Sequence, residues 1–236
     1  MIREWNKIYY CDCLDYKKGL PSLPDKSIDL CITDPPWNIN YKGSVGSNEK
    51  RKKREGIFYN DKIKDYQLFS LRWFYEINRI CKRIIFTPGI QNLKMWYRIT
   101  EPTEIILHYK KNGCYGGRIS VFNCFDPFLY YGKAKTYFVH NVIEKHSTVG
   151  FCKIQDIKHG CPKNRAVWYE IIKGIKPDSV IDPFMGSGTT AEVCTKLGIP
   201  WLGYEINEIY RQDIEKRLKG CVKEPEQINL LKFVVH

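Results

Sequence analysis

Two short stretches of the sequence place an acidic residue directly after a run of residues that favour a buried strand. Asp34 opens the tetrapeptide "DPPW" at 34–37, and Asp182 opens "DPFMGSGTT" at 182–190. In α/β proteins, ligands bind at the carboxyl ends of parallel strands. Both acids are therefore candidate ligand-binding groups, although Asp-Pro-Pro by itself could also form a rigid loop without such a role.

The second stretch has the composition of a turn that approaches a ligand closely. Gly186 and Gly188 allow the backbone to come near a bound molecule, and a helix that begins near Thr189 offers free N–H groups. Glu205 ends the next predicted strand, where nucleotide-binding folds use an acid to accept hydrogen bonds from ribose hydroxyls. The pattern favours a nucleoside-binding site, and the alternative is that the glycines only make a tight turn.

The elements that would position these residues follow the alternation of an α/β sheet. Short apolar runs alternate with amphipathic segments of helical length. We expect strands at 7–12, 27–34, 83–89, 104–110, 179–184 and 200–206, and helices at 66–82, 164–174, 188–198 and 207–219. The glycine turn lacks the third glycine of Gly-x-Gly-x-x-Gly, which disfavours a nicotinamide-dependent oxidoreductase, and no Gly-Lys-Ser/Thr phosphate loop occurs.

The composition fits a single domain over residues 1–236 with a polyanionic partner. A chain of 236 residues that is 43% hydrophobic can bury one substantial core. Its net charge of +12 favours a partner such as nucleic acid. We expect a cytoplasmic protein without a membrane segment, because no apolar run approaches about 20 residues and no signal peptide is apparent. The ten scattered cysteines indicate reduced thiols and no metal site.

Two stretches interrupt the alternation of strands and helices. Residues 42–60 predict a mobile basic loop, since loops of this length are usually functional or disordered. Residues 111–150 predict an insertion of irregular or antiparallel structure that could recognise a target. Its aromatic and basic residues suit nucleic acid and equally suit a small β-meander core. The basic run of the loop could contact phosphates or only solvate the surface; it comprises Lys50, Arg51, Lys52, Lys53 and Arg54.

An Asp-Pro-Pro-aromatic tetrapeptide followed later by this glycine turn resembles the DNA amino-methyltransferases that use S-adenosylmethionine. The order of the motifs resembles their permuted, or beta, class, in which the catalytic motif precedes the cofactor motif. The resemblance covers roughly residues 6–41 and 156–219. It implies a Rossmann-like class I methyltransferase fold, with a mostly parallel sheet, helices on both faces and a circularly permuted motif order.

The resemblance also implies a set of site residues. In the opening segment Asp12 fits the family pattern, whereas Cys11 replaces the usual glycine. Before the cofactor loop His159 and Lys163 fit, whereas Gly160, Pro162 and Asn164 depart from it. The implied catalytic residues are Asp34, Pro35, Pro36 and Trp37. The implied cofactor-binding residues are Asp12, Thr33, Asp34, Lys163, Asp182, Pro183, Phe184, Gly186, Ser187, Gly188, Thr189, Glu205 and Asn207.

The tetrapeptide suits chemistry on the exocyclic amine of a nucleobase. Such an amine is a poor nucleophile because its lone pair is delocalised into the ring. Asp34 and the carbonyl of Pro35 can accept both amine hydrogens and favour the positive charge that develops on nitrogen, and the prolines keep these acceptors aimed. Trp37 can stack on a base turned out of the duplex, worth about 1–3 kcal/mol, or can serve as a buried anchor.

We therefore expect a DNA methyltransferase that acts on the N6 amine of adenine. An Asp in the first position favours adenine by resemblance, whereas relatives that methylate cytosine N4 more often have Ser. Trp37 in place of Tyr leaves RNA or free nucleotides open as substrates. A non-catalytic nucleic-acid binding module is disfavoured because Asp34 and the glycine turn are both present. The expected partner is DNA, and a homodimer and a cognate restriction endonuclease stay open.

Overall fold

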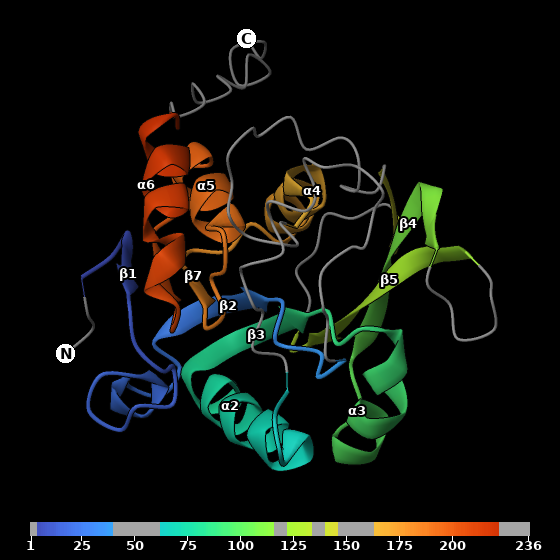
Figure 1. The fold of residues 1–236 in the computed structure, drawn as a ribbon, viewed down its shortest axis with the longest axis horizontal. Helices are drawn as coiled ribbons and strands as arrows, with labels where there is room; N and C mark the ends of the chain where they lie inside the picture. The colour runs from blue at the N-terminus through green and yellow to red at the C-terminus, as the bar shows by residue number, and fades with distance from the viewer. Residues whose placement is uncertain (1–3, 40–61, 116–121, 134–139, 146–162, 222–236) are drawn as a thin grey trace, which may run out of the picture.

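The computed structural model describes residues 4–39, 62–115, 122–133, 140–145 and 163–221 (Figure 1). Their strands form one 8-stranded sheet in the order β1-β8-β7-β2-β3-β5-β4-β6. The strands are β1 (Lys7–Tyr9), β2 (Ile28–Thr33), β3 (Cys81–Phe86), β4 (Glu104–Tyr115), β5 (Phe122–Tyr131), β6 (Val142–Lys145), β7 (Val180–Asp182) and β8 (Trp201–Tyr204). Strand β5 is antiparallel to both of its neighbours, and the other adjacent pairs are parallel. The sheet is therefore mostly parallel, as the sequence predicts.

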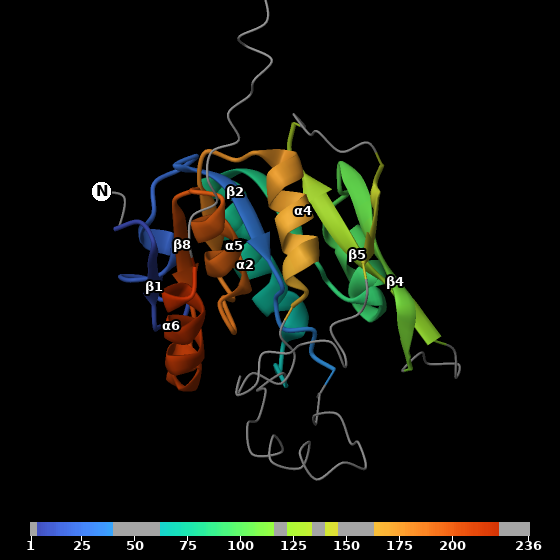
Figure 2. The same ribbon diagram turned by 90° about the horizontal axis from the view of Figure 1, so that it is seen from above.

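Helices cover both faces of the sheet (Figure 1 and Figure 2). They are α2 (Tyr66–Ile80), α3 (Leu93–Ile99), α4 (Arg165–Ile175), α5 (Thr189–Lys196) and α6 (Arg211–Lys219), with short 3-10 helices at Leu20–Ser22, Ile90–Asn92 and Glu208–Tyr210. Figure 1 shows α4, α5 and α6 on one face of the sheet and α2 and α3 on the other. This is the layered arrangement of a doubly wound α/β fold.

The core forms because successive side chains of a strand point to opposite faces. Strand β2 is buried along its whole length. Its Leu30 and Ile32 pack in the cluster with α4 and α5, and Cys31 packs in the cluster with α2 and α3. On α2, Trp73 and Ile77 are fully buried and face the sheet, as the helical spacing of its apolar residues predicts. Central β2 is thus fixed from both sides.

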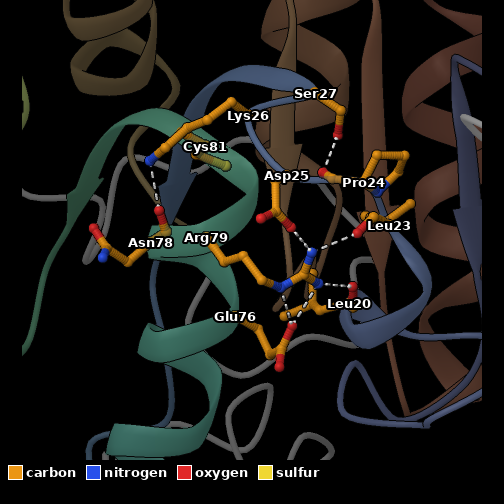
Figure 3. Close-up of polar contacts among 10 residues, drawn as sticks. All are labelled: Leu20, Leu23, Pro24, Asp25, Lys26, Ser27, Glu76, Asn78, Arg79 and Cys81. Carbon is orange, nitrogen blue, oxygen red and sulfur yellow. Dashed lines mark hydrogen bonds and ion pairs between the residues drawn. The ribbon is translucent and has the colours of Figure 1, made fainter.

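A network around Arg79 ties the C-terminal end of α2 to the segment that leads into β2 (Figure 3). The Arg79 guanidinium donates to the carbonyls of Leu20 and Leu23 at 3.2 and 2.8 Å and pairs with Asp25 at 2.5 Å. The Lys26 ammonium donates to the carbonyls of Asn78 and Cys81 at 2.7 and 2.9 Å. These bonds satisfy carbonyls at the end of the helix and set the path of the chain into β2.

The predicted strands and helices are all present, with ends shifted by a few residues. The last helix begins as a 3-10 turn at Glu208–Tyr210 before α6. Antiparallel structure was expected within 111–150, and β5 is antiparallel to β3 and β4. Helix α3, strand β6 and the 3-10 helices at Leu20–Ser22 and Ile90–Asn92 were not predicted. The range 111–150 contributes β5 and β6 to the main sheet, and Phe128 and Tyr130 of β5 are buried in the core. These two aromatic residues therefore serve the core; target recognition by the range stays a prediction.

The described residues show neither a membrane-spanning helix nor a cluster of metal-ligating side chains. No helix among them is long and apolar enough to cross a bilayer. Within the same part of the chain, no group of three or more His, Cys, Asp or Glu residues gathers where it could hold a metal ion.

Candidate active site

The two acidic motifs meet at one edge of the sheet. Strands β2 and β7 are parallel neighbours, with Leu30 opposite Val180 and Cys31 opposite Ile181. Their carboxyl ends therefore place Asp34 and Asp182 side by side in the fold. A single pocket is lined by Asp34, by Lys163 just before α4, and by the turn that follows β7.

Asp182 organises this turn through its carboxylate. Its Oδ1 accepts hydrogen bonds from Thr33 Oγ1 at 2.6 Å and from the Phe184 N–H at 3.0 Å, and its Oδ2 accepts one from Thr190 Oγ1 at 2.5 Å. Burial raises the pKa of Asp182 to about 6. Trp168 Nε1 donates a hydrogen bond to Thr190 Oγ1 at 2.9 Å. Asp182 thus shapes the pocket, supported by Thr190 and Trp168, two residues that sequence reasoning missed.

The turn itself depends on two glycines in the left-handed region. Gly186 has φ 53° and Gly188 has φ 82°, conformations that are costly for other residues. A Cβ atom on Gly188 would also lie 3.2 Å from the side chain of Ile214 on α6. Helix α5 starts at the next residue, Thr189, so the backbone N–H groups of its first turn lie beside the pocket.

Glu205, the expected ribose ligand, sits immediately after β8. Its Oε2 accepts a hydrogen bond from the Gly186 N–H at 2.7 Å, and its Oε1 accepts one from the Asn207 N–H at 2.8 Å. Burial raises the pKa of Glu205 to about 7. A carboxylate oxygen can accept more than one hydrogen bond, so Glu205 can also accept from a ligand hydroxyl. On the neighbouring strand β1, exposed Asp12 follows the strand end, and its carboxylate accepts from the Leu14 N–H at 2.8 Å.

The Asp-Pro-Pro-Trp loop is held by one residue just after β3, one residue of α2 and one residue of the 3-10 helix that follows β3. Trp37 Nε1 donates to the Thr87 carbonyl at 3.0 Å. The Tyr66 hydroxyl donates to the Pro36 carbonyl at 2.9 Å, and Asn92 Nδ2 donates to the Trp37 carbonyl at 2.9 Å. Sequence reasoning missed these three partners. The tryptophan is half-buried.

Asp34 has one occupied and one unoccupied oxygen. Its Oδ2 lies 2.7 Å from the Lys163 ammonium, whereas Oδ1 is buried and accepts no hydrogen bond among the described residues. Burial raises the pKa of Asp34 above its usual value, and the charge of Lys163 opposes this. The same ammonium lies 4.5 Å from the centroid of the Trp37 ring. A donor that enters the pocket would therefore meet this carboxylate at Oδ2, where the Lys163 ammonium binds it.

Some of the predicted site residues line the pocket. Others are buried or follow the neighbouring strands. The predicted residues that line it are Asp34, Lys163, Asp182, Phe184, Gly186, Ser187 and Thr189. Those buried around it are Thr33, Pro35, Pro183 and Gly188. Glu205 and Asn207 follow β8, where the Asn207 side chain accepts from the Ile209 N–H. The basic run at 50–54 and His159 lie outside the described residues.

We expect the ligand-free protein to lose stability as pH rises through the titration of Glu205. The unfolded chain releases this proton near the ordinary pKa of 4.5, and the folded protein releases it near about 7. Between these values the folded state binds more protons, so the free energy of unfolding falls as pH rises. Urea denaturation at about pH 5 and about pH 7.5 should show a flatter dependence for Glu205→Gln than for wild type. If the free energy of unfolding changed equally between the two pH values in both proteins, the raised pKa of Glu205 would be contradicted.

Comparison with known proteins gives a consistent match. Residues 28–216 match the family model N6_N4_Mtase, described as DNA methylase. The Type II methyltransferase M.HinfI of Haemophilus influenzae is 27% identical over 98% of this chain and 73% of its own length. M.HpaI of Haemophilus parainfluenzae is 26% identical over 87% of this chain and 73% of its own length.

Two solved structures share the fold of this chain. The complex of M1.HpyAVI with S-adenosylmethionine superposes with a TM-score of 0.64 at 21% identity, covering 90% of this chain and 98% of the other. The cytosine-N4-specific PvuII DNA methyltransferase gives 0.63 at 18% identity, covering 96% and 89%. The sheet is thus that of class I methyltransferases. With the family match over most of its length, this chain belongs to the DNA methylase family of S-adenosylmethionine-dependent DNA amino-methyltransferases.

Proposed function

We propose that this protein transfers the methyl group of S-adenosylmethionine to the N6 amine of adenine in DNA. The observation that carries the proposal is the shared pocket, in which Asp34 and the turn after Asp182 lie together. A methyl donor bound on the turn would be next to an amine held by Asp34. Alignment of amine, methyl and sulfur is the main catalytic requirement, because the cofactor brings its own leaving group.

The cofactor would bind along the carboxyl ends of β7, β8 and β1. Glu205 would accept the ribose hydroxyls with the lone pairs that Gly186 and Asn207 leave open. Phe184 lines the pocket and gives an apolar wall to the nucleoside. Asp12 would face the adenine of the cofactor. The permuted motif order is part of this proposal, since Asp34 precedes the glycine turn along the chain.

Asp34 would activate the target amine. Its carboxylate and the carbonyl of Pro35 would accept the two amine hydrogens, which draws the nitrogen lone pair out of the ring and toward the methyl group. The carboxylate would also stabilise the positive charge that nitrogen gains as the C–N bond forms. The hydrogen bonds from Tyr66 and Asn92 to the Pro36 and Trp37 carbonyls keep the loop rigid, so the acceptors need no rearrangement during the reaction.

The target base would have to leave the duplex to reach Asp34. An enzyme that reacts with a base atom commonly turns the nucleotide out into a pocket and stacks the base on an apolar or aromatic side chain. Trp37 supports this step, since its ring is fixed by the bond to the Thr87 carbonyl and one face lies under Lys163, which lines the pocket.

Sequencing of DNA from a host that expresses the protein tests the choice of base. Single-molecule reads should show N6-methyladenine at one sequence motif and none in a host that carries Asp34→Ala. Detection of N4-methylcytosine instead would show that the target base is cytosine and not adenine. Absence of both modifications, with the protein expressed and folded, would count against DNA as the substrate.

The proposal includes two partners beyond DNA. A cognate restriction endonuclease is suggested by the similarity to M.HinfI and M.HpaI, which are Type II methyltransferases. The second partner is another copy of this chain, in a homodimer. Light scattering coupled to gel filtration gives the oligomeric state, and a monomer at assay concentration would remove the homodimer.

The basic run at 50–54 is proposed to bind DNA phosphates. Replacing its five residues with glutamine should weaken DNA binding at any sequence and should reduce the slope of log K against log salt by about 0.9 for each phosphate that is no longer neutralised. Affinity for S-adenosylmethionine should stay unchanged. A charge-matched control replaces exposed basic residues elsewhere, namely Lys17, Lys18, Lys94, Lys216 and Lys219. Equal slopes for the two variants would show that the run acts only through long-range attraction, which is largely screened beyond a Debye length of about 8 Å near physiological salt.

A further inference from the structure

The Lys163 ammonium contacts both groups that a target base would use, the Asp34 carboxylate and the Trp37 ring. It is 2.7 Å from Asp34 Oδ2, the carboxylate that would accept the amine. It is also 4.5 Å from the centroid of the Trp37 ring, on the face where a base would stack. An ammonium resembles an exocyclic amine in this position, because both are nitrogen donors to a carboxylate.

We propose that Lys163 is a target-site residue: its ammonium holds the place of the target amine until a base enters, and it is displaced from Asp34 in each turnover. This inference rests on the proposed function. It differs from the role implied by family resemblance, in which Lys163 contacts the cofactor.

A base and the ammonium cannot occupy the site together. Asp34 Oδ1 is shielded from solvent, so an incoming donor approaches the carboxylate at the oxygen that Lys163 holds. A ring stacked on Trp37 at ordinary van der Waals distance would likewise fill the space of the ammonium. Entry of a base therefore requires Lys163 to leave both partners.

Displacement of Lys163 by the base would select for bases that carry an exocyclic amine. The side chains of Lys163 and Asp34 are only 23% and 13% exposed, so removing the ammonium leaves a shielded carboxylate that needs another donor. A base with an exocyclic amine replaces the missing N–H group. Thymine presents a carbonyl oxygen at the equivalent position, which cannot donate and is repelled by the carboxylate. Bases without the amine are therefore rejected when they try to displace Lys163.

Asp126 on β5 is a second negative charge that acts on the Lys163 ammonium. The charged groups that act on Asp34 come from three sides: Lys163 before α4, Asp126 on β5 and Asp182 on β7. Burial raises the pKa of Asp126, but His108 and Lys110 outweigh it, so the pKa lies below its usual value. Asp126 thus stays ionised beside Lys110, 2.7 Å away. Its negative charge attracts Lys163 and lowers the cost of leaving Asp34.

The pH dependence of turnover separates the two states. The acid limb of kcat/KM reports the free enzyme, and that of kcat reports the enzyme–substrate complex. Asp34 must be ionised to act, and it has its ammonium partner only before the base enters. In wild type we expect the kcat limb to lie at higher pH than the kcat/KM limb. In Lys163→Met the acid limb of kcat/KM should shift to higher pH until it coincides with the acid limb of kcat, and the kcat limb should stay at its wild-type pH. In Lys163→Arg the two limbs should stay separated as in wild type.

Calorimetry with S-adenosylmethionine completes the test and checks the fold of each variant. Lys163→Met should bind the cofactor within about twofold of wild type, because the ammonium holds the target site. The inference would be overturned if the acid limbs of kcat and kcat/KM lay at the same pH in the wild-type enzyme. This result needs no variant. A loss of cofactor affinity greater than tenfold in both variants would also overturn it, since that would place Lys163 at the cofactor. Failure of wild type to methylate any DNA would count instead against the proposed function.

Discussion

Replacing Asp34 with alanine is expected to lower methyl transfer to DNA by about 10²–10³-fold or more, the usual cost of removing a preorganised group at a developing charge. The carboxylate lines the shared pocket together with the glycine turn. Its loss would leave the amine lone pair delocalised in the base. Binding of S-adenosylmethionine should stay within about twofold, because the cofactor turn is organised by Asp182 and not by Asp34.

A tritiated-methyl assay on mixed-sequence duplex DNA measures this effect, with calorimetry for the cofactor. Asp178→Ala is the matched control, since Asp178 is an exposed acid on the surface before β7 and should retain wild-type activity. Residual activity of Asp34→Ala within about tenfold of wild type, roughly 1.4 kcal/mol of barrier, would refute the catalytic assignment.

Replacing Glu205 with alanine is expected to weaken binding of S-adenosylmethionine by at least about tenfold, or about 1.4 kcal/mol. The change removes the proposed ribose acceptor. It also leaves the N–H groups of Gly186 and Asn207 without their acceptor, which costs about 1–3 kcal/mol for a buried group and loosens the turn. A lower melting temperature should therefore accompany the loss of affinity.

Two comparisons separate the direct role of Glu205 from its structural role. Glu208→Ala removes an acid whose side chain is 69% exposed and should bind the cofactor as wild type does. Glu205→Gln keeps the shape and one oxygen acceptor, so it should restore more stability than affinity. Unchanged affinity in Glu205→Ala would remove the ribose assignment, whatever happens to the melting temperature.

The sequence predicted the central sheet because its strands are short apolar runs between amphipathic helices. For 111–150 it predicted irregular or antiparallel structure but not the bounds of antiparallel β5, because Pro127 interrupts the run and proline within a run argues against a strand. In the fold, Pro127 lies opposite Leu107 in the β4–β5 pair, and the buried aromatic residues around it hold the strand in the core. Helix α3 was missed because its 7 residues are too few to reveal a helical period.

The candidate site was predictable where it depends on strand ends and not where it depends on long-range contacts. Asp34 and Asp182 could be placed together because the carboxyl ends of parallel strands share an edge. The hydrogen bonds of Tyr66 and Asn92 to the Asp-Pro-Pro-Trp loop join segments far apart in the chain. A local sequence pattern cannot predict such contacts. The position of Lys163 on Asp34 likewise becomes visible only in three dimensions.

The most direct test of the account is to follow the methyl group itself. Purified protein is incubated with duplex DNA and S-adenosylmethionine that carries a deuterated methyl group, and the digested nucleosides are identified by mass spectrometry. The account predicts deuterated N6-methyldeoxyadenosine with wild type and with Asp178→Ala, and none above background with Asp34→Ala. Equal labelling by wild type and Asp34→Ala, or no labelled nucleoside from any DNA supplied to a wild-type protein that binds the cofactor, would contradict it.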